Sequence, residues 1–109
     1  MEKELPKFHE TFSPILNILR DGKTLHHREL IREVVNQYYS DLPQELLQRE
    51  TKSGEPLLHN RIAWGKSYLK KGGFLEYPKR GMVRITEKGR NQQTDLSLKE
   101  VETSDGFFN

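Results

Sequence analysis

The stretch "SYLKKGGFLEYPKRGMVRIT", residues 67–86, decides the predicted fold. Lys70 and Lys71 end a helical pattern, and a pair of glycines then stops the helix. Two short apolar runs follow on either side of "PKRG", which predicts a β-hairpin with a short basic turn. Basic residues are therefore expected both at the end of a helix and at the tip of a hairpin.

Upstream of this stretch and into its beginning, apolar residues repeat with the spacing of amphipathic helices. The three repeats are Phe8, Phe12, Ile15, Leu16 and Leu19; Leu30, Ile31, Val34, Val35, Tyr38 and Tyr39; and Leu58, Ile62, Gly65 and Leu69. Pro14 suits a first turn, so the first helix is expected to begin at Ser13 or to bend there, and Gly22 to end it.

The segments between these helices contain shorter sequence patterns, which predict shorter elements. Residues 23–27 are compatible with a very short strand, and residues 40–50 predict a short helix with Asp41 as its cap and Pro43 in its first turn. Thr86 is expected to cap a last helical turn. The resulting order is that of a winged helix-turn-helix, a mainly α fold with a small β-hairpin (α+β), over residues 8–90.

Residues 91–109 are polar and predict a flexible C-terminal tail or linker. Phe107 and Phe108 at its end leave two alternatives open, docking on the domain or the beginning of a further part of a longer protein.

Composition limits the function classes. The chain has 109 residues, 33% of them hydrophobic and 31% charged, which is enough for one domain with a modest core. It has no cysteine, which excludes disulfides, thiol nucleophiles and thiolate metal sites. No apolar run approaches the roughly 20 residues of a membrane span, and the start "MEKELPKFHE" does not resemble a signal peptide. We expect a cytoplasmic protein.

The charge is unevenly distributed along the chain. Between His59 and Arg90 lie nine basic and two acidic residues, a net charge of +7, whereas the remainder has nine basic and fourteen acidic residues, a net charge of −5. This asymmetry favours a polyanion-binding face over a merely solvated, lysine-rich surface.

In a winged helix the recognition helix enters the major groove and the wing lies over the neighbouring backbone. The basic helix end and hairpin tip match these two phosphate contacts, and amide and hydroxyl groups suit base edges. Arg61 points sideways, toward either a phosphate or an acid on the second helix, and Arg84 is expected on the solvent side of the wing. The predicted partner is double-stranded DNA, and the predicted DNA-binding residues are Asn60, Arg61, Lys66, Ser67, Lys70, Lys71, Lys79, Arg80 and Arg84.

The stretch "LLHNRIAWGKSYLKKGGFLEYPKRGMVRITEKG" also resembles the N-terminal domain of the Mrr-type restriction endonucleases. That family follows approximately N-R-x-x-W-A-x-x-x-L-K-x-A-G-L, then R-G and I/L-T-x-x-G. The residues that match are Asn60, Arg61, Trp64, Leu69, Lys70, Gly73, Arg80, Gly81, Ile85, Thr86 and Gly89. Gly65 and Gly72 replace two usual alanines, and Phe74 replaces a usual leucine. Gly65 is expected either to loosen the helix or to admit a close backbone contact.

The resemblance, which covers roughly residues 8–90, implies recognition of methylated DNA and cleavage by a separate, C-terminal nuclease domain, as in type IV restriction endonucleases. The sequence leaves open whether this chain is a domain of a longer protein or a stand-alone reader, and whether it forms a homo-oligomer. The alternative function is a winged-helix protein-interaction or dimerisation module.

No catalytic or metal site is predicted, and no cofactor. Asp41 with "ETK" (Glu50, Lys52) imitates a nuclease carboxylate pattern, but it lies in a helix-loop stretch without an apolar strand and is attributed to chance. The four histidines have no cysteine or paired carboxylate with them that would complete a set of metal ligands. Trp64 lies at the edge of the helix's outward face, where packing is favoured over stacking on a base, and Tyr68 is expected beside the core.

Overall fold

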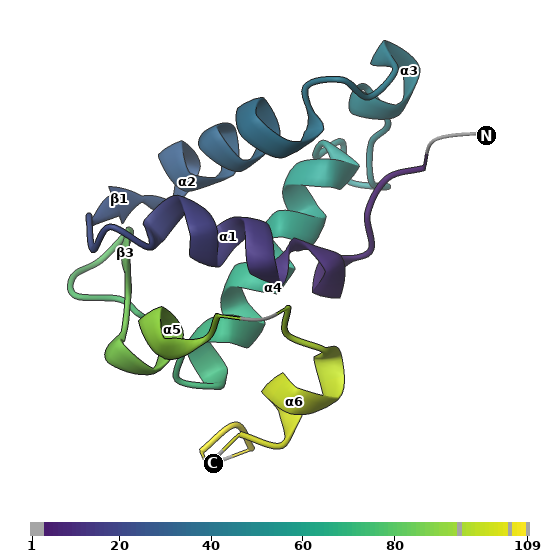
Figure 1. The fold of residues 1–109 in the computed structure, drawn as a ribbon. Helices are drawn as coiled ribbons and strands as arrows, with labels where there is room; N and C mark the ends of the chain where they lie inside the picture. Colours follow the sequence, from purple (N-terminus) through teal and green to yellow (C-terminus); the bar gives the residue numbers. More distant parts are fainter. Residues whose placement is uncertain (1–3, 94, 105, 109) are drawn as a thin grey trace.

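A computed structural model of the chain describes residues 4–93, 95–104 and 106–108. The predicted α+β winged helix-turn-helix is confirmed: the chain is mostly helical, with a small antiparallel sheet at one end of the helices, and the elements follow in the expected order (Figure 1). The elements are a 3₁₀-helix at Phe8–Thr11, α1 (Phe12–Leu19), β1 (Leu25–His26), α2 (His27–Val34), a π-helical segment at Val35–Tyr39, α3 (Gln44–Leu47), α4 (Leu57–Lys71), β2 (Leu75–Glu76), β3 (Met82–Ile85), α5 (Glu87–Asn91) and α6 (Leu98–Glu102).

The sheet has the strand order β1-β3-β2, with both neighbouring pairs antiparallel. The very short strand expected at residues 23–27 is therefore present, and it pairs Leu25 with Val83. In β3, Val83 and Ile85 are buried while Met82 and Arg84 are partly exposed. This alternation confirms that Arg84 projects from the solvent side of the hairpin.

The core lies between α1, α2 and α4 and beneath the sheet, and Figure 1 shows α1 lying across α4 with the sheet at one end of the helices. The apolar stripe of α4 is buried as the spacing predicts, at Leu58, Ile62, Gly65 and Leu69. Tyr68 packs at the edge of the core, also as predicted.

Several helix boundaries differ from the predictions. The first α-helix begins at Phe12, one residue before Ser13, and Pro14 lies in its first turn. Asp41 does not cap the third helix, because Pro43 occupies the position before its first residue. The second helix changes to π-helix after Val34, and a π-turn holds more residues than an α-turn, so the apolar stripe does not continue to Tyr38, which is exposed.

Thr86 fixes the position of the hairpin relative to the end of α4. Its hydroxyl donates to the carbonyl of Gly73 (2.6 Å) and accepts from the amide of Gly89 (3.1 Å), while its own amide donates to the carbonyl of Phe74 (3.1 Å). Gly89 packs against Phe74, where a Cβ would overlap with the carbonyl oxygen. The predicted Thr86 cap is confirmed, and it also holds the residues that follow α4.

Gly65 lies where α4 approaches the 3₁₀-helix. A Cβ at this position would overlap with the hydroxyl of Thr11 and would lie 2.9 Å from the carbonyl oxygen of Phe8. Thr11 is fully buried, and its hydroxyl donates to that same carbonyl (2.6 Å). Of the two alternatives for Gly65, the close backbone contact is the one observed.

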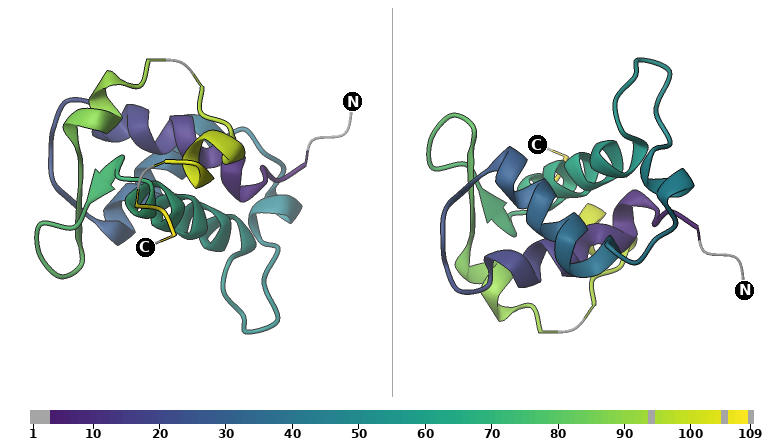
Figure 2. Two further views of the ribbon diagram at one scale, coloured as in Figure 1. Left: turned by 90° about the horizontal axis from the view of Figure 1, so that it is seen from below. Right: turned by 90° about the horizontal axis from the view of Figure 1, so that it is seen from above.

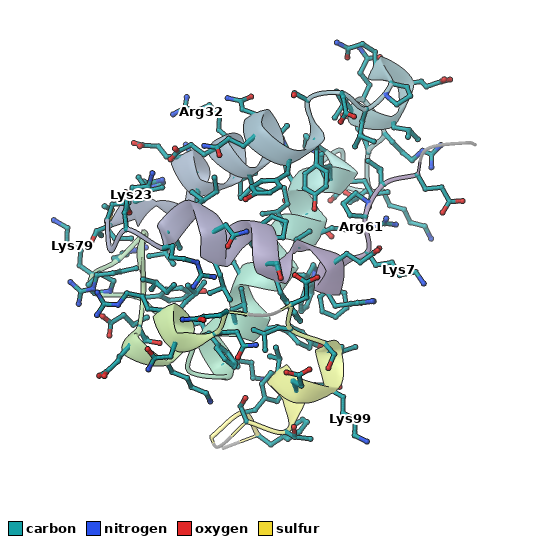
Figure 3. The ribbon with its side chains drawn as sticks, viewed as in Figure 1. Lys7, Lys23, Arg32, Arg61, Lys79 and Lys99 are labelled. Carbon is teal, nitrogen blue, oxygen red and sulfur yellow. The ribbon has the colours of Figure 1, made fainter. Side chains whose placement is uncertain are left out.

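Arg61 holds the N-terminal segment on α4. One of its guanidinium nitrogens donates to the carbonyl of Pro6 (3.0 Å) and lies 3.4 Å from that of Leu5, whose side chain is buried. Figure 3 shows Arg61 beside this segment and separated from Lys79 at the hairpin. No acid of the second helix pairs with Arg61 in the described part of the chain.

The segment after Asn91, for which the sequence predicts a tail or linker, contains α6 and contributes Leu96, Val101 and Phe107 to the core. The ring centroids of Phe107 and Tyr68 are 5.4 Å apart, whereas Phe108 is 79% exposed. Residues 94, 105 and 109 of this segment lie outside the described residues.

The first prediction concerns Gly65. We expect Gly65→Ala to lower the free energy of unfolding, because overpacking costs about 1–3 kcal/mol and outweighs the roughly 1 kcal/mol that alanine gains in helix propensity. The loss should be smaller in a Thr11→Ala background, where one of the two overlapping groups is gone. Urea unfolding of the four proteins of this cycle measures both effects. An equal loss in both backgrounds would contradict this account of the contact.

The second prediction concerns Arg61. We expect Arg61→Ala to lower the free energy of unfolding by about 1–3 kcal/mol, because two carbonyls lose a charged donor. Amide hydrogen exchange should accelerate in residues 5–11 before it does in the sheet. Arg61→Lys is the control and should retain part of the protection. Unchanged exchange of the N-terminal segment in Arg61→Ala would show that the guanidinium does not hold it.

Candidate nucleic-acid interface

The interface is built around one side of α4. His59, Ala63, Lys66 and Lys70 follow one another at intervals of four, three and four residues, which places them on one face of the helix. None of the four belongs to the buried stripe, and Lys70 is exposed. The end of α4 that carries Lys70 is the end that leads into the sheet.

A groove of about 920 Å³ separates this side of α4 from α2. Ile31 lines it from α2, Val35 from the π-helical segment that continues this helix, and Ala63 from α4. Arg28 and Arg32 lie along the same groove and are exposed. Glu29 and Glu55 also line it, so the groove is mixed in charge, with the arginines one helical turn apart on α2.

The wing, residues 77–81 between β2 and β3, is attached to the beginning of α2. The carbonyl of Gly81 accepts from the backbone amide of His27 (2.9 Å) and lies 3.2 Å from its Nδ1. The rings of His26 and His27 are stacked with centroids 4.3 Å apart, and His26 Nδ1 accepts from the amide of Arg28 (3.2 Å). Gly81 has a φ of +80°, a conformation that favours glycine.

These attachments leave the middle of the wing free of the domain. Figure 2 shows the wing and the loop that precedes α4 projecting on the same side of the molecule, with α4 between them. Lys79 and Arg80 lie in this wing and are exposed. The Arg84 guanidinium binds the carboxylate of Glu76 on the neighbouring strand, with nitrogen–oxygen distances of 2.8 and 2.6 Å.

At the base of the wing, Tyr77 lies against α4. Lys66 Nζ is 5.3 Å and Lys70 Nζ 5.6 Å from the centroid of its ring. The Ser67 hydroxyl lies close enough to the Tyr77 phenol to lower its pKa, against the larger effect of burial. The predicted residues Lys66, Ser67 and Lys70 are thereby brought together with one that the sequence analysis did not select.

The remaining predicted residues lie further round α4. Asn60 donates to the carboxylate of Glu55 (3.1 Å), and Lys71 Nζ lies 4.9 Å from the centroid of the Phe107 ring. Arg61 points to the N-terminal segment, as described above. The structure therefore gathers Lys66, Ser67, Lys70, Lys79 and Arg80 on the groove and wing side and places Arg61 elsewhere.

The expectation that Trp64 packs in the core is wrong. Trp64 is 55% exposed, because it lies on α4 away from the buried stripe and meets only the edge of the aromatic cluster, 6.4 Å from the Tyr68 ring centroid. With Asn60, Arg61 and Lys7 it lines a separate hollow, on the side of α4 that faces the N-terminal segment.

Sequence reasoning missed Arg28, Arg32 and Tyr77. The two arginines had a usable signal, since their spacing of four residues places both on one side of the second helix, beside its apolar stripe. Tyr77 had none, because its place beside the lysines depends on how the hairpin folds back on α4.

In the parts of the chain that the structure describes, no group of three or more His, Asp or Glu side chains is arranged to hold a metal ion. Glu50 lies in an isolated β-bridge with Pro56, in the loop before α4, rather than in a sheet. The described helices include none that is long and apolar enough to cross a membrane.

Comparison with known families finds a match to the Mrr N-terminal domain over residues 8–94. Comparison with curated proteins finds no match, and neither does comparison with solved structures. The matched residues run from the 3₁₀-helix past α5, and so include the groove, Lys66 and Lys70 of α4, and the wing. The chain belongs to the Mrr N-terminal domain family, which is associated with the Mrr restriction proteins.

Proposed function

We propose that this domain binds double-stranded DNA and is the target-recognition part of an Mrr-like restriction endonuclease that acts on methylated DNA. In this proposal α4 faces the major groove and the wing lies over the adjacent backbone. Recognition is assigned to this chain and cleavage to a separate nuclease domain, as the family resemblance implies.

The observation that carries the proposal is the placement of basic side chains from three elements on one side of the domain. They are Arg28 and Arg32 of α2, Lys66 and Lys70 of α4, and Lys79 and Arg80 of the wing. No described carboxylate lies within 4.0 Å of any of these six charged groups, whereas Arg84 and Lys23 have acidic partners. Positive groups without acidic partners on one face are the electrostatic footprint of a polyanion site.

The roles of the predicted residues follow from their positions. Lys66, Lys70, Lys79 and Arg80 contact phosphates, and Lys71 is a further phosphate candidate at the end of α4. Ser67 and Asn60 are the candidates for base edges; Asn60 lies where this side of α4 meets the hollow beside Trp64, and it would exchange its Glu55 acceptor for a base. Arg61 and Arg84 support the interface by holding the N-terminal segment and the two hairpin strands.

A second candidate function, a protein-interaction or dimerisation module, is favoured by the exposure of Trp64 on the other side of α4. An interface centred on an aromatic side chain depends little on salt. Salt dependence therefore separates the two functions.

The third prediction concerns binding to DNA. We expect the chain to bind a short duplex, measured by fluorescence anisotropy, with about five phosphate contacts and a slope of log affinity against log salt of about −4.5. Lys79→Glu/Arg80→Glu should lower the affinity more than tenfold and make the slope less steep by about two. Lys7→Glu/Lys99→Glu is the control; it makes the same change in net charge at positions that Figure 3 shows away from Lys79.

If wild type does not bind the duplex at 50 mM salt, the DNA-binding proposal is wrong and the protein-interaction function takes its place. Equal losses in the two charge-reversal variants would mean that net charge, and not the wing, attracts the DNA.

The fourth prediction concerns methylation. Matched duplexes that are unmethylated, contain N6-methyladenine or contain 5-methylcytosine should differ in affinity, with one modified duplex bound about fivefold or more tightly, since a good major-groove contact contributes about 1–3 kcal/mol of discrimination. The same anisotropy assay measures this at one fixed salt concentration. Equal affinity for the three duplexes would remove methylation from the proposal and leave DNA binding.

A further inference from the structure

Tyr77 holds two lysines of α4 in one place. Lys66 and Lys70 are separated by one helical turn, and both ammonium groups lie within 5.6 Å of the centroid of the same ring. An aromatic ring attracts cations to its face, so the ring draws both lysines toward the base of the wing. Without it, two neighbouring ammonium groups would separate into solvent, because like charges repel.

The Tyr77 phenol also lies close to Ser67, which is between the two lysines in the sequence of α4. Burial raises the pKa of Tyr77, although the Ser67 hydroxyl opposes this, so the phenol keeps its proton at neutral pH. Tyr77 is 42% exposed, which leaves the cluster open to a ligand.

The cluster lacks an internal counter-charge. No described carboxylate lies within 4.0 Å of Lys66 or Lys70, and the nearest acid in the sequence, Glu76, is bound to Arg84. Lys66 is partly buried, and this burial lowers its pKa. A partly desolvated ammonium group beside a second one is stabilised by an external anion.

We propose that Lys66 and Lys70, held against the Tyr77 ring and next to the Ser67 hydroxyl, clamp one backbone phosphate of the DNA where the duplex passes from α4 to the wing. This rests on the proposed function and adds a positioning residue to it. Tyr77 contributes by arranging the lysines before binding, which reduces the ordering that binding requires.

The test compares the salt slope of duplex binding in the full chain and in four variants. Tyr77→Leu removes the ring and Tyr77→Phe keeps it; Lys66→Gln removes one charge of the clamp, and Lys99→Gln is the matched control on α6. We expect Tyr77→Leu and Lys66→Gln each to lower affinity about tenfold. Each should also make the slope of log affinity against log salt less steep by about one, because one phosphate contact is lost.

Tyr77→Phe should stay within about threefold of wild type because its ring still attracts both lysines, and Lys99→Gln should match wild type. A merely structural role of Tyr77 would lower the melting temperature without changing the slope. Wild-type slopes in Tyr77→Leu and Lys66→Gln would overturn the clamp while leaving DNA binding intact, whereas loss of binding in wild type would overturn the proposed function itself.

A second measurement covers the case in which Tyr77→Leu does not fold. In wild type, the pKa of the Lys66 ammonium group is followed by NMR with and without duplex, and with inorganic phosphate in place of DNA. The clamp predicts that the duplex raises this pKa. No change with duplex would overturn it, and an equal rise with millimolar inorganic phosphate would show a general anion site rather than a DNA contact.

Discussion

The hydrogen bonds of Thr86 are the constraint on which the arrangement of the interface depends. Its hydroxyl joins Gly73, two residues after the end of α4, to the first turn of α5, and the Thr86 amide donates to the carbonyl of Phe74 at the beginning of the hairpin. Gly89 lets these segments approach, since a side chain there would meet the Phe74 carbonyl. The wing therefore leaves the domain at a fixed angle to α4, and at its other end the carbonyl of Gly81 attaches it to α2.

The fixed arrangement of α2, α4 and the wing explains why one face of a nearly neutral chain is positive. The chain has a net charge of only +2, but its acids and bases do not alternate evenly over the surface. Glu76 and Glu33 bind Arg84 and Lys23, while the basic residues along α2, α4 and the wing have no described acidic partner. A face of this kind costs free energy in the isolated domain through self-repulsion, and a bound polyanion offsets that cost.

Much of the fold could be predicted because its signals are local. The apolar stripe of α4, the glycines that end α1 and α4, and the Thr86 cap each depend on a few neighbouring residues, and each was predicted from the sequence. The π-helical segment was not, and the expected packing of Trp64 was wrong because its position on α4, away from the buried stripe, leaves it exposed. Arg61 shows the limit of local signals, since its carbonyl partners lie 55 and 56 residues away in the sequence.

The candidate site, too, has a part that could be predicted from the sequence and a part that could not. Charge and spacing were enough to select the lysines of α4 and the basic pair of the wing. Only the folded chain brings Tyr77 next to Lys66 and Lys70, and Arg28 and Arg32 to the groove beside α4. Gly65 illustrates how an apparent weakness in a helix is a packing requirement, because Thr11 occupies the space of the missing side chain.

The central claim is that the side of the domain formed by α2, α4 and the wing contacts DNA. Amide and side-chain NMR shifts of the whole chain, followed while a short duplex is added, test it most directly. The account predicts that the changes concentrate at Arg28, Arg32, Lys66, Lys70, Lys79 and Arg80. Changes centred instead on Trp64, Arg61 and Lys7 would contradict it and would place the DNA on the opposite side of α4.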